Sequence, residues 1–279
     1  MQILTAKHSG FCEGVERAYR IALEQSKLGR QIFMLGKLVH NTQVVEKFEK
    51  AGVKTVSSIA EIPNGSTVIF SAHGVTPQTY DQAKAKQLVV IDTSCGWVKK
   101  AQRVAKQFHE AGRQVIIIGD KGHTEVKGLI GWAGGAAPVI EDIKDIEGLG
   151  DMGIKGIGVL AQTTQSEKRF NKIVAELKKK FTDVKAINTI CDATAKRQSA
   201  AIELAQKVDL MLIIGDQLSA NTKRLTELCA QTGTETHQIQ TVNEMDSRWR
   251  DRKIERIGIT AGASTPDWVI QAVVDTLNV

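Results

Sequence analysis

The apolar residues of this chain of 279 residues alternate between short β-branched runs and longer stretches with helical spacing. This alternation is typical of parallel sheets, because a crossover between parallel strands needs about a dozen or more residues and is usually a helix. The expected strands are Gln2–Thr5, Gln31–Leu35, Thr67–Ser71, Leu88–Ile91, Gln114–Gly119, Gly156–Ala161, Leu210–Gly215 and Arg256–Thr260. The pattern therefore predicts an α/β protein with parallel sheets.

Three of the intervening segments have a clear helical period. They are Val15–Gly29, Trp97–His109 and Ala195–Lys207. In each segment apolar residues recur three and four positions apart, which places them on one face of a helix. We expect these faces to pack on the sheets.

Composition and charge narrow the classes of function. The chain is 42% hydrophobic and 24% charged, as in an ordinary globular protein, and its aromatic content of 5% is too low for base-stacking platforms. The net charge of +6 suits an anionic small molecule or an acidic protein partner as well as it suits nucleic acid. Because aromatic residues are so few, we expect no nucleic-acid partner. No apolar run approaches the roughly 20 residues that span a bilayer, and the start lacks the plan of a secretory signal. We expect a cytoplasmic protein without a membrane partner.

Four cysteines are present, at Cys12, Cys95, Cys191 and Cys229. None forms a C-x-x-C pair, so the zinc-ribbon, thioredoxin and zinc-deaminase patterns are missing. Structural disulfides are improbable in a reducing compartment, which leaves buried thiols, a nucleophile or a metal centre. The first three are separated by 83 and 96 residues, as if three similar segments each supplied one.

Cys12, Cys95 and Cys191 each stand just before one of the three predicted helices. The unpaired N–H groups and the positive end of the dipole at a helix N-terminus favour the thiolate, which is the form that binds iron. For any one cysteine, a small residue at a crowded turn is an adequate explanation, but three at similar spacing favour a metal centre. Cys229 instead lies beside Leu225 within a helical pattern, which predicts a buried, inert thiol.

Polar residues follow five predicted strands at the carboxyl ends, where ligands collect in α/β sheets. These segments are Ser71–Gly74, Gly119–Glu125, Ala161–Ser166, Gly215–Asn221 and Thr260–Ser264. Their His, Glu, Thr, Ser and Asn side chains suit a phosphate group and a site of protonation. Solvation is an adequate explanation for Asp120 and Gln217, but a weaker one for His40, His73 and His123.

Three competing motifs are weaker. Gly156–Ala161 matches G-x-G-x-x-A, but it is itself a predicted strand rather than the turn after one. His123-Thr124-Glu125 has the H-x-E order of zinc deaminases without their second half. A mononuclear metal site of His40, His73, His123 and Glu125 is conceivable on ligand chemistry, but it would leave the three cysteines unexplained.

Nine motifs occur in one order along the whole chain. They are Gly10–Val15, Val39–Asn41, Ser71–Val75, Asp92–Cys95, Gly122–Val126, Gln162–Ser166, Ile190–Thr194 with Arg197-Gln198, Ser219–Asn221 with Arg224-Leu225, and Thr260–Asp267. In these motifs the chain resembles the 4-hydroxy-3-methylbut-2-enyl diphosphate reductases of the LytB family. So many motifs in the family's order are specific.

The resemblance implies three similar α/β lobes in pseudo-threefold arrangement around a central iron–sulfur cluster. The lobes would be residues 13–95, residues 96–190, and residues 191–279 with the N-terminal strand 1–12. Cys12, Cys95 and Cys191 would each ligate the single [4Fe–4S] cluster of the chain, which leaves one iron without a protein ligand.

The resemblance also implies a reaction and its residues. Two electrons and two protons would remove the substrate's hydroxyl group as water and yield isopentenyl and dimethylallyl diphosphate, the last step of the methylerythritol phosphate pathway. Glu125 and Thr163 would manage protons at the hydroxyl. The diphosphate would be held by His40, His73, His123, Ser219, Ala220 through its backbone N–H, Asn221 and Ser264. The electrons would come from an acidic donor protein of the ferredoxin or flavodoxin type.

Three departures from the family's pattern keep alternatives open. Ala220 replaces a second serine, Gly96-Trp97 follows Cys95, and Glu13 stands beside Cys12 and would lower a cluster's reduction potential if it were buried. The alternatives are a divergent paralogue that is a non-catalytic cluster protein, and another three-cysteine cluster enzyme similar to quinolinate synthase.

Overall fold

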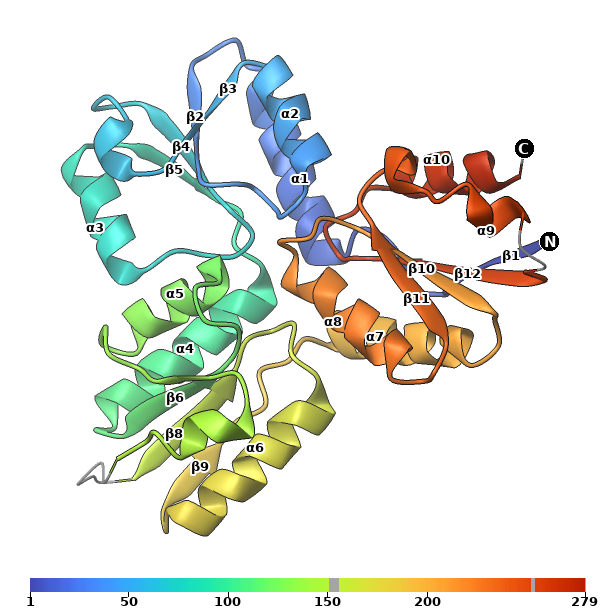
Figure 1. The fold of residues 1–279 in the computed structure, drawn as a ribbon. Coiled ribbons are helices and arrows are strands. Elements are labelled where there is room, and N and C mark those ends of the chain that lie inside the picture. Colours follow the sequence, from blue (N-terminus) through green and yellow to red (C-terminus); the bar gives the residue numbers. More distant parts are fainter. Residues whose placement is uncertain (151–155, 252–253, 279) are drawn as a thin grey trace. The chain divides into compact units, whose positions relative to one another are not determined.

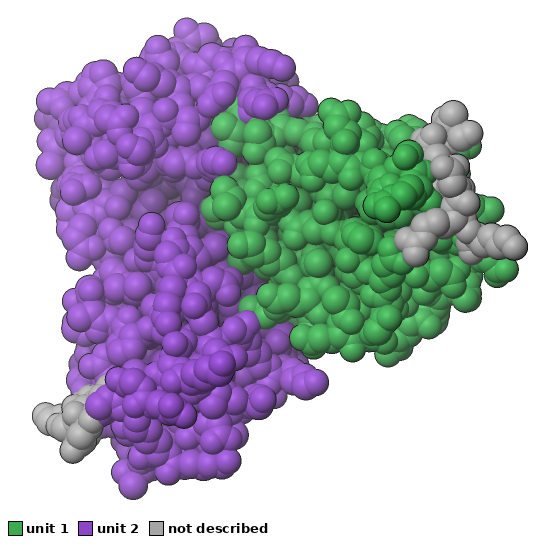
Figure 2. Space-filling model, in the orientation of Figure 1, with its two compact units in different colours: residues 1–16, 39–45, 192–279 green, residues 17–38, 46–191 purple. Residues whose placement is uncertain are grey.

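The computed structural model describes residues 1–150, 156–251 and 254–278. The chain divides into two compact units (Figure 2). Unit 1 comprises residues 1–16, 39–45 and 192–279, and unit 2 comprises residues 17–38 and 46–191. No described helix combines the length and the apolar character that a membrane-spanning segment needs.

The described strands form three parallel sheets of four strands each (Figure 1). Unit 2 contains a sheet of order β3-β2-β4-β5, made of β2 (Ile32–Leu35), β3 (Val53–Val56), β4 (Thr67–Phe70) and β5 (Val89–Asp92). It also contains the order β7-β6-β8-β9, made of β6 (Gln114–Ile118), β7 (Val139–Ile140), β8 (Ile157–Ala161) and β9 (Val184–Ala186). Unit 1 contains the order β1-β12-β10-β11, made of β1 (Gln2–Thr5), β10 (Leu210–Ile214), β11 (Glu235–Ile239) and β12 (Arg256–Ala261).

Helices follow strands along the chain, both within a sheet and between one sheet and the next (Figure 1). They are α1 (Glu13–Ser26), α2 (Thr42–Lys50), α3 (Pro77–Ala85), α4 (Gly96–Glu110), α5 (Thr124–Trp132), α6 (Glu167–Lys180), α7 (Asp192–Ala205), α8 (Ala220–Ala230), α9 (Arg248–Asp251) and α10 (Asp267–Leu277). Short 3-10 helices lie at Ile59–Glu61, Ile143–Ile146 and Val242–Glu244.

The predicted α/β class with parallel sheets is confirmed, and so is its division into three similar lobes, one around each sheet. The N-terminal strand joins the C-terminal sheet, with Gln2 paired to Arg256. The exact lobe ranges and their pseudo-threefold arrangement stay predictions.

Four strands that the apolar pattern did not predict, β3, β7, β9 and β11, all lie at sheet edges. The central strands β4, β8 and β10 are buried along their whole length, and they therefore read as continuous apolar runs. These four edge strands lack that signal. β7 has 2 residues, and β11 has the polar sequence ETHQI with one buried residue.

Glycine allows α4 to pack closely on β8. Gly158 lies in β8, as the rejection of the dinucleotide motif predicted, and a Cβ atom at this position would fall on the ring of Phe108 from α4. Phe108 is 4% exposed, so its ring has little room to move. The glycine is needed here for close packing.

We expect Gly158→Ala to destabilise the protein by about 1–3 kcal/mol, because the new methyl group overpacks the contact with Phe108. The matched control is Gly128→Ala in α5, where the nearest atom to an added Cβ is 3.8 Å away. That change should leave stability unchanged or raise it by up to about 1 kcal/mol, since alanine is the better helix former. Denaturant unfolding measures both, and an equal loss in the two variants would contradict this account.

Candidate functional site

The four cysteines occupy two kinds of environment. Cys12, Cys95 and Cys191 are partly exposed and stand immediately before α1, α4 and α7. Cys95 is the N-cap residue of its helix. Cys229 is buried within α8, and this burial raises the pKa of its thiol to about 12. The predicted placement of all four is confirmed, so three thiols are accessible at helix N-termini and one is an inert core residue.

A buried acid lies in the first turn of α5 in unit 2. Glu125 is 2% exposed, and its Oε1 accepts a hydrogen bond of 2.7 Å from the backbone N–H of Thr163. Its Oε2 accepts a second bond, of 2.8 Å, from the Thr163 hydroxyl. Burial raises the pKa of Glu125 to about 7, although the two bonds from Thr163 act in the opposite direction. The carboxyl group is therefore suited to exchange a proton near neutral pH.

One histidine is bonded to the backbone of this acid, and a second histidine contacts the first. His123 is the N-cap of α5, and its Nδ1 accepts a bond of 3.1 Å from the backbone N–H of Glu125. In a neutral ring with this tautomer, Nε2 carries the proton and is a donor. The rings of His73 and His123 meet edge to face, with 5.6 Å between their centroids.

Backbone hydrogen bonds connect the acid and the histidines to two of the cysteines. The N–H of Cys191 donates to the carbonyl of Thr163 at 3.0 Å, and the N–H of Cys95 donates to the carbonyl of Ala72, beside His73, also at 3.0 Å. Unit 2 thus brings together the predicted residues Cys95, Cys191, His73, His123, Glu125 and Thr163.

The remaining predicted residues belong to unit 1. The Ser264 hydroxyl donates to the carbonyl of His40 at 2.9 Å and lies 3.5 Å from Oγ of Ser219. The N–H of Cys12 donates to the carbonyl of Ala263 at 3.3 Å. Unit 1 therefore gathers one cysteine and three polar residues around the loop that contains Ser264.

The N-terminus of α8 contains buried polar groups that suit a ligand. Ser219 is its N-cap, and Ala220 and Asn221 are its first residues, 8% and 4% exposed. In the described part of the chain, neither Oδ1 nor Nδ2 of Asn221 has a hydrogen-bond partner. A buried polar group left unpaired costs about 1–3 kcal/mol, and a helix N-terminus attracts anions. Both features fit a phosphate-bearing ligand.

Two buried charged residues position the site in unit 1, and the sequence analysis assigned no role to either of them. Asp216 is 3% exposed, and its carboxylate accepts bonds from the Thr42 hydroxyl at 3.1 Å and the Leu218 N–H at 2.8 Å. It therefore ties the segment of His40 to the loop before α8. The available signal was its place two residues after the end of the buried strand β10.

The second is Arg197, which is 3% exposed and donates from Nη2 to the carbonyl of Gly10 at 2.6 Å. Gly10 has φ +80, and a Cβ there would lie 2.9 Å from Oδ1 of Asp267. The turn that leads to Cys12 thus requires glycine and is held by a buried guanidinium.

The structure places the three departures from the family pattern. Glu13 is exposed at the start of α1. It therefore does not fulfil the condition of burial under which it would lower a cluster's reduction potential. Ala220 is the first residue of α8 and supplies a backbone N–H without a hydroxyl. Gly96 begins α4, and the ring of Trp97 lies under the Lys100 ammonium, 4.6 Å from its centroid.

Comparison with known proteins identifies the family. The family model described as LytB protein matches residues 3–278. The chain belongs to the LytB family. A curated relative from Geobacter sulfurreducens is 43% identical over 278 residues, which cover 100% of this chain and 97% of the relative. One from Geobacter metallireducens is 42% identical with the same coverage. Both are named 4-hydroxy-3-methylbut-2-enyl diphosphate reductase.

Solved LytB structures agree with this membership. The E-1-hydroxy-2-methyl-but-2-enyl-4-diphosphate reductase of Plasmodium falciparum matches with a TM-score of 0.94 at 32% identity, over 100% of this chain and 88% of that one. A second structure, described as (E)-4-hydroxy-3-methyl-but-2-enyl diphosphate reductase, the terminal enzyme of the non-mevalonate pathway, matches with a TM-score of 0.71 at 37% identity, over 100% and 99%. The family resemblance inferred from the motifs is confirmed.

Membership of the LytB family implies an iron–sulfur cofactor, and the residues present fit one. Cysteine thiolates are the usual ligands of iron–sulfur clusters, and three accessible cysteines stand at helix N-termini, where thiolate is favoured. The fourth, Cys229, has a pKa of about 12 and is unsuited to ligation.

The raised pKa of Glu125 makes stability depend on pH. The pKa of Glu125 is about 7 in the folded protein and 4.5 ordinarily. As the pH rises, the unfolded chain therefore releases this proton at a lower pH than the folded protein does. The unfolding free energy should therefore fall as pH rises from about 4.5 to 7, by about 3 kcal/mol from this group. Glu125→Gln removes the effect, so the stability of the variant relative to the wild type should rise over this window.

The measurement is denaturant unfolding of the cofactor-free proteins between pH 4.5 and 8. Glu49→Gln, the same change at an exposed position of α2, is the control and should follow the wild type. If the stability difference between the wild type and Glu125→Gln stays constant over the window, Glu125 has an ordinary pKa.

Proposed function

We propose that this protein is a 4-hydroxy-3-methylbut-2-enyl diphosphate reductase that removes the substrate's hydroxyl group as water with two electrons and two protons. The products are isopentenyl and dimethylallyl diphosphate, as in the last step of the methylerythritol phosphate pathway. The observation that carries the proposal is the buried Glu125 carboxyl, held by Thr163, whose carbonyl in turn accepts the N–H of Cys191. A proton source thus lies beside a cysteine suited to iron.

Cys12, Cys95 and Cys191 would hold one [4Fe–4S] cluster per chain, with one iron left without a protein ligand. Such a cluster supplies electrons and an open Lewis-acid position for the substrate's oxygen. The support for this assignment is the shared placement of the three cysteines before helices and the contrasting burial of Cys229.

The diphosphate would be held by small donors and histidines: His40, His73, His123, Ser219, the Ala220 N–H, Asn221 and Ser264. The unpaired amide of Asn221 and the N-terminus of α8 support this role in unit 1. In unit 2 it is supported by the placement of His123 at the N-cap of α5, where its Nδ1 accepts the backbone N–H of Glu125 and the other ring nitrogen of the neutral tautomer is a donor. Charge-assisted bonds from such donors are about twice as strong as neutral ones.

Glu125 and Thr163 would manage the proton. With a pKa of about 7, Glu125 is protonated in a large fraction of molecules at neutral pH and can donate to the departing hydroxyl. The Thr163 hydroxyl donates to Oε2 and orients the carboxyl group. A negative diphosphate nearby would raise the pKa of the acid further.

The electrons would come from an acidic donor protein of the ferredoxin or flavodoxin type, in keeping with the net charge of +6. The cytoplasmic location remains a prediction. Family membership favours the reductase over an enzyme similar to quinolinate synthase.

Anaerobic turnover of 4-hydroxy-3-methylbut-2-enyl diphosphate by the cofactor-loaded protein with an artificial reductant tests the proposal. An intact cluster without turnover would instead indicate a non-catalytic paralogue.

The cluster assignment predicts a three-to-one division of the cysteines. Cys12→Ser, Cys95→Ser and Cys191→Ser should each lose cluster iron and activity, whereas Cys229→Ser should retain both, because its thiol is buried away from helix N-termini. Iron and sulfide analysis with visible absorption gives the answer. Loss of the absorption in Cys229→Ser alone would contradict the assignment.

The proton role predicts that Glu125→Gln lowers turnover by about 10²–10⁴-fold, since the amide keeps the shape but has no acidic proton. The dissociation constant of the substrate should change much less, because the acid acts on the hydroxyl rather than on the diphosphate. Anaerobic kinetics and a binding titration separate the two effects, with Glu49→Gln as the control. Turnover within a few-fold of the wild type would remove Glu125 from the proton path.

A further inference from the structure

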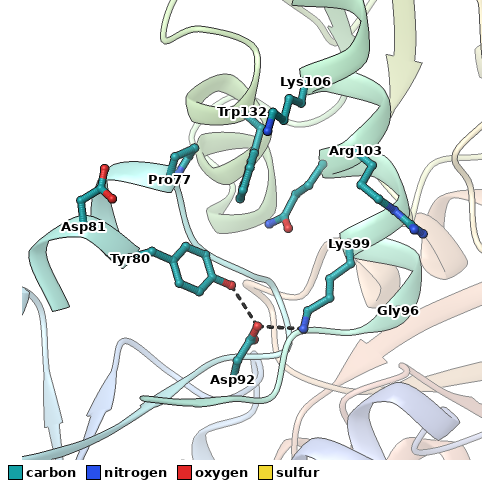
Figure 3. Close-up of a pocket in the computed structure, with 10 residues that line it drawn as sticks. Pro77, Tyr80, Asp81, Asp92, Gly96, Lys99, Arg103, Lys106 and Trp132 are labelled. Carbon is teal, nitrogen blue, oxygen red and sulfur yellow. Dashed lines mark hydrogen bonds and ion pairs between the residues drawn. The ribbon is translucent and has the colours of Figure 1, made fainter. Parts of the chain in front are cut away.

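Unit 2 contains a cavity of about 630 Å³ that none of the residues proposed for catalysis lines. Figure 3 shows the residues that line the cavity: Pro77, Tyr80 and Asp81 belong to α3, Trp132 belongs to α5, and Lys99, Arg103 and Lys106 belong to α4. The lining is completed by Asp92, Gly96 and Gln102. This cavity combines an aromatic wall with a row of cations.

The cations follow one face of α4. Lys99, Arg103 and Lys106 are spaced i, i+4 and i+7, which places them in one row. The row is only partly neutralised: Lys99 pairs with Asp92 at 2.8 Å, and Lys106 lies 3.6 Å from Glu110. Among the described residues Arg103 has no ion-pair partner. The one acidic residue of α4 is Glu110, the last residue of the helix, so the rest of the helix presents a positive face.

The aromatic wall is held rigidly with its polar atoms already paired. The Tyr80 hydroxyl donates to Asp92 at 2.9 Å, and the Trp132 Nε1–H donates to the carbonyl of Val75 at 3.0 Å. The two rings meet edge to face, with 6.4 Å between their centroids. Burial and the adjacent Asp92 raise the pKa of Tyr80 to about 12, so the phenol keeps its proton. The wall therefore offers apolar ring surface to an incoming group.

The row begins beside a proposed cluster ligand. Cys95 is the N-cap of α4, and Gly96, the next residue, lines the cavity. With a rise of 1.5 Å per residue, Lys99, Arg103 and Lys106 lie about 6, 12 and 16 Å along the helix from Cys95. A protein bound on this face would lie close to the point where its electrons are needed.

We propose that this cavity and its cationic rim form the docking surface for the small acidic electron-carrier protein that the reaction requires. The inference rests on the proposed function, because it is the reduction that needs an external donor. An aromatic anchor inside a charged rim is the usual anatomy of a protein interface. Three cations spread over two turns fit an extended acidic surface better than a single small anion, and complementary charge accelerates such an encounter.

The test compares the cofactor-loaded wild type with the double variant Arg103→Glu and Lys106→Glu. The control is Lys172→Glu with Lys178→Glu, two exposed lysines of α6 in the same unit that change the charge equally. Binding of an acidic [2Fe–2S] ferredoxin is measured by calorimetry at low and high salt. We expect binding about tenfold weaker or more in the α4 variant at low salt, a smaller difference at high salt, and nearly wild-type binding in the control.

Equal weakening in both variants, unchanged binding in the α4 variant, or no binding by the wild type at low salt would each overturn the docking proposal. Turnover with a small viologen reductant is measured in parallel and should be the same in all three proteins. Absence of that turnover in the wild type would refute the proposed reductase instead, so the two failures are distinguishable.

Discussion

Parallel strand pairing is the constraint on which the rest of this structure depends. Because every neighbouring pair in the three sheets is parallel, the strands of one sheet end at the same edge, and the chain returns through an α-helix or a segment with a short 3-10 helix. The loops that leave β4, β6, β8, β10 and β12 therefore contain the polar side chains, and the following helices begin beside them. The cysteines before α4 and α7 and the N-cap residues His123 and Ser219 all derive their chemistry from this geometry.

Burial then gives these side chains their properties. Glu125 enters the interior at the start of α5, and the loss of hydration raises its pKa to about 7 while the bonds from Thr163 hold its orientation. A similar loss of hydration at Cys229 raises the pKa of a thiol to about 12 and makes it inert. Burial thus brings the pKa of a carboxyl group close to neutral pH in one place and keeps a thiol protonated and unreactive in another.

Two polar groups without partners among the described residues lie at the two surfaces for which ligands are proposed. Within the described chain the amide of Asn221 has no partner, although it is 4% exposed. Arg103 likewise stands on an exposed helix face with no opposing charge among the described residues. The proposed diphosphate would give the Asn221 amide a partner, and the proposed acidic protein would do the same for Arg103.

The amino-acid sequence by itself determined the α/β class, the central strands and the cysteines at helix N-termini, because burial on both faces of a strand and helical periodicity are local signals. The ordered motifs also determined the family and the predicted site residues. Only the tertiary structure decided the edge strands β3, β7, β9 and β11, which are too short or too polar to form an apolar run. It also revealed the roles of Asp216 and Arg197 and the bond between Cys191 and Thr163, since each joins segments that are distant in the chain or depends on burial. No local pattern records which carbonyl a buried guanidinium reaches, or how far the loss of water shifts a carboxyl group's pKa.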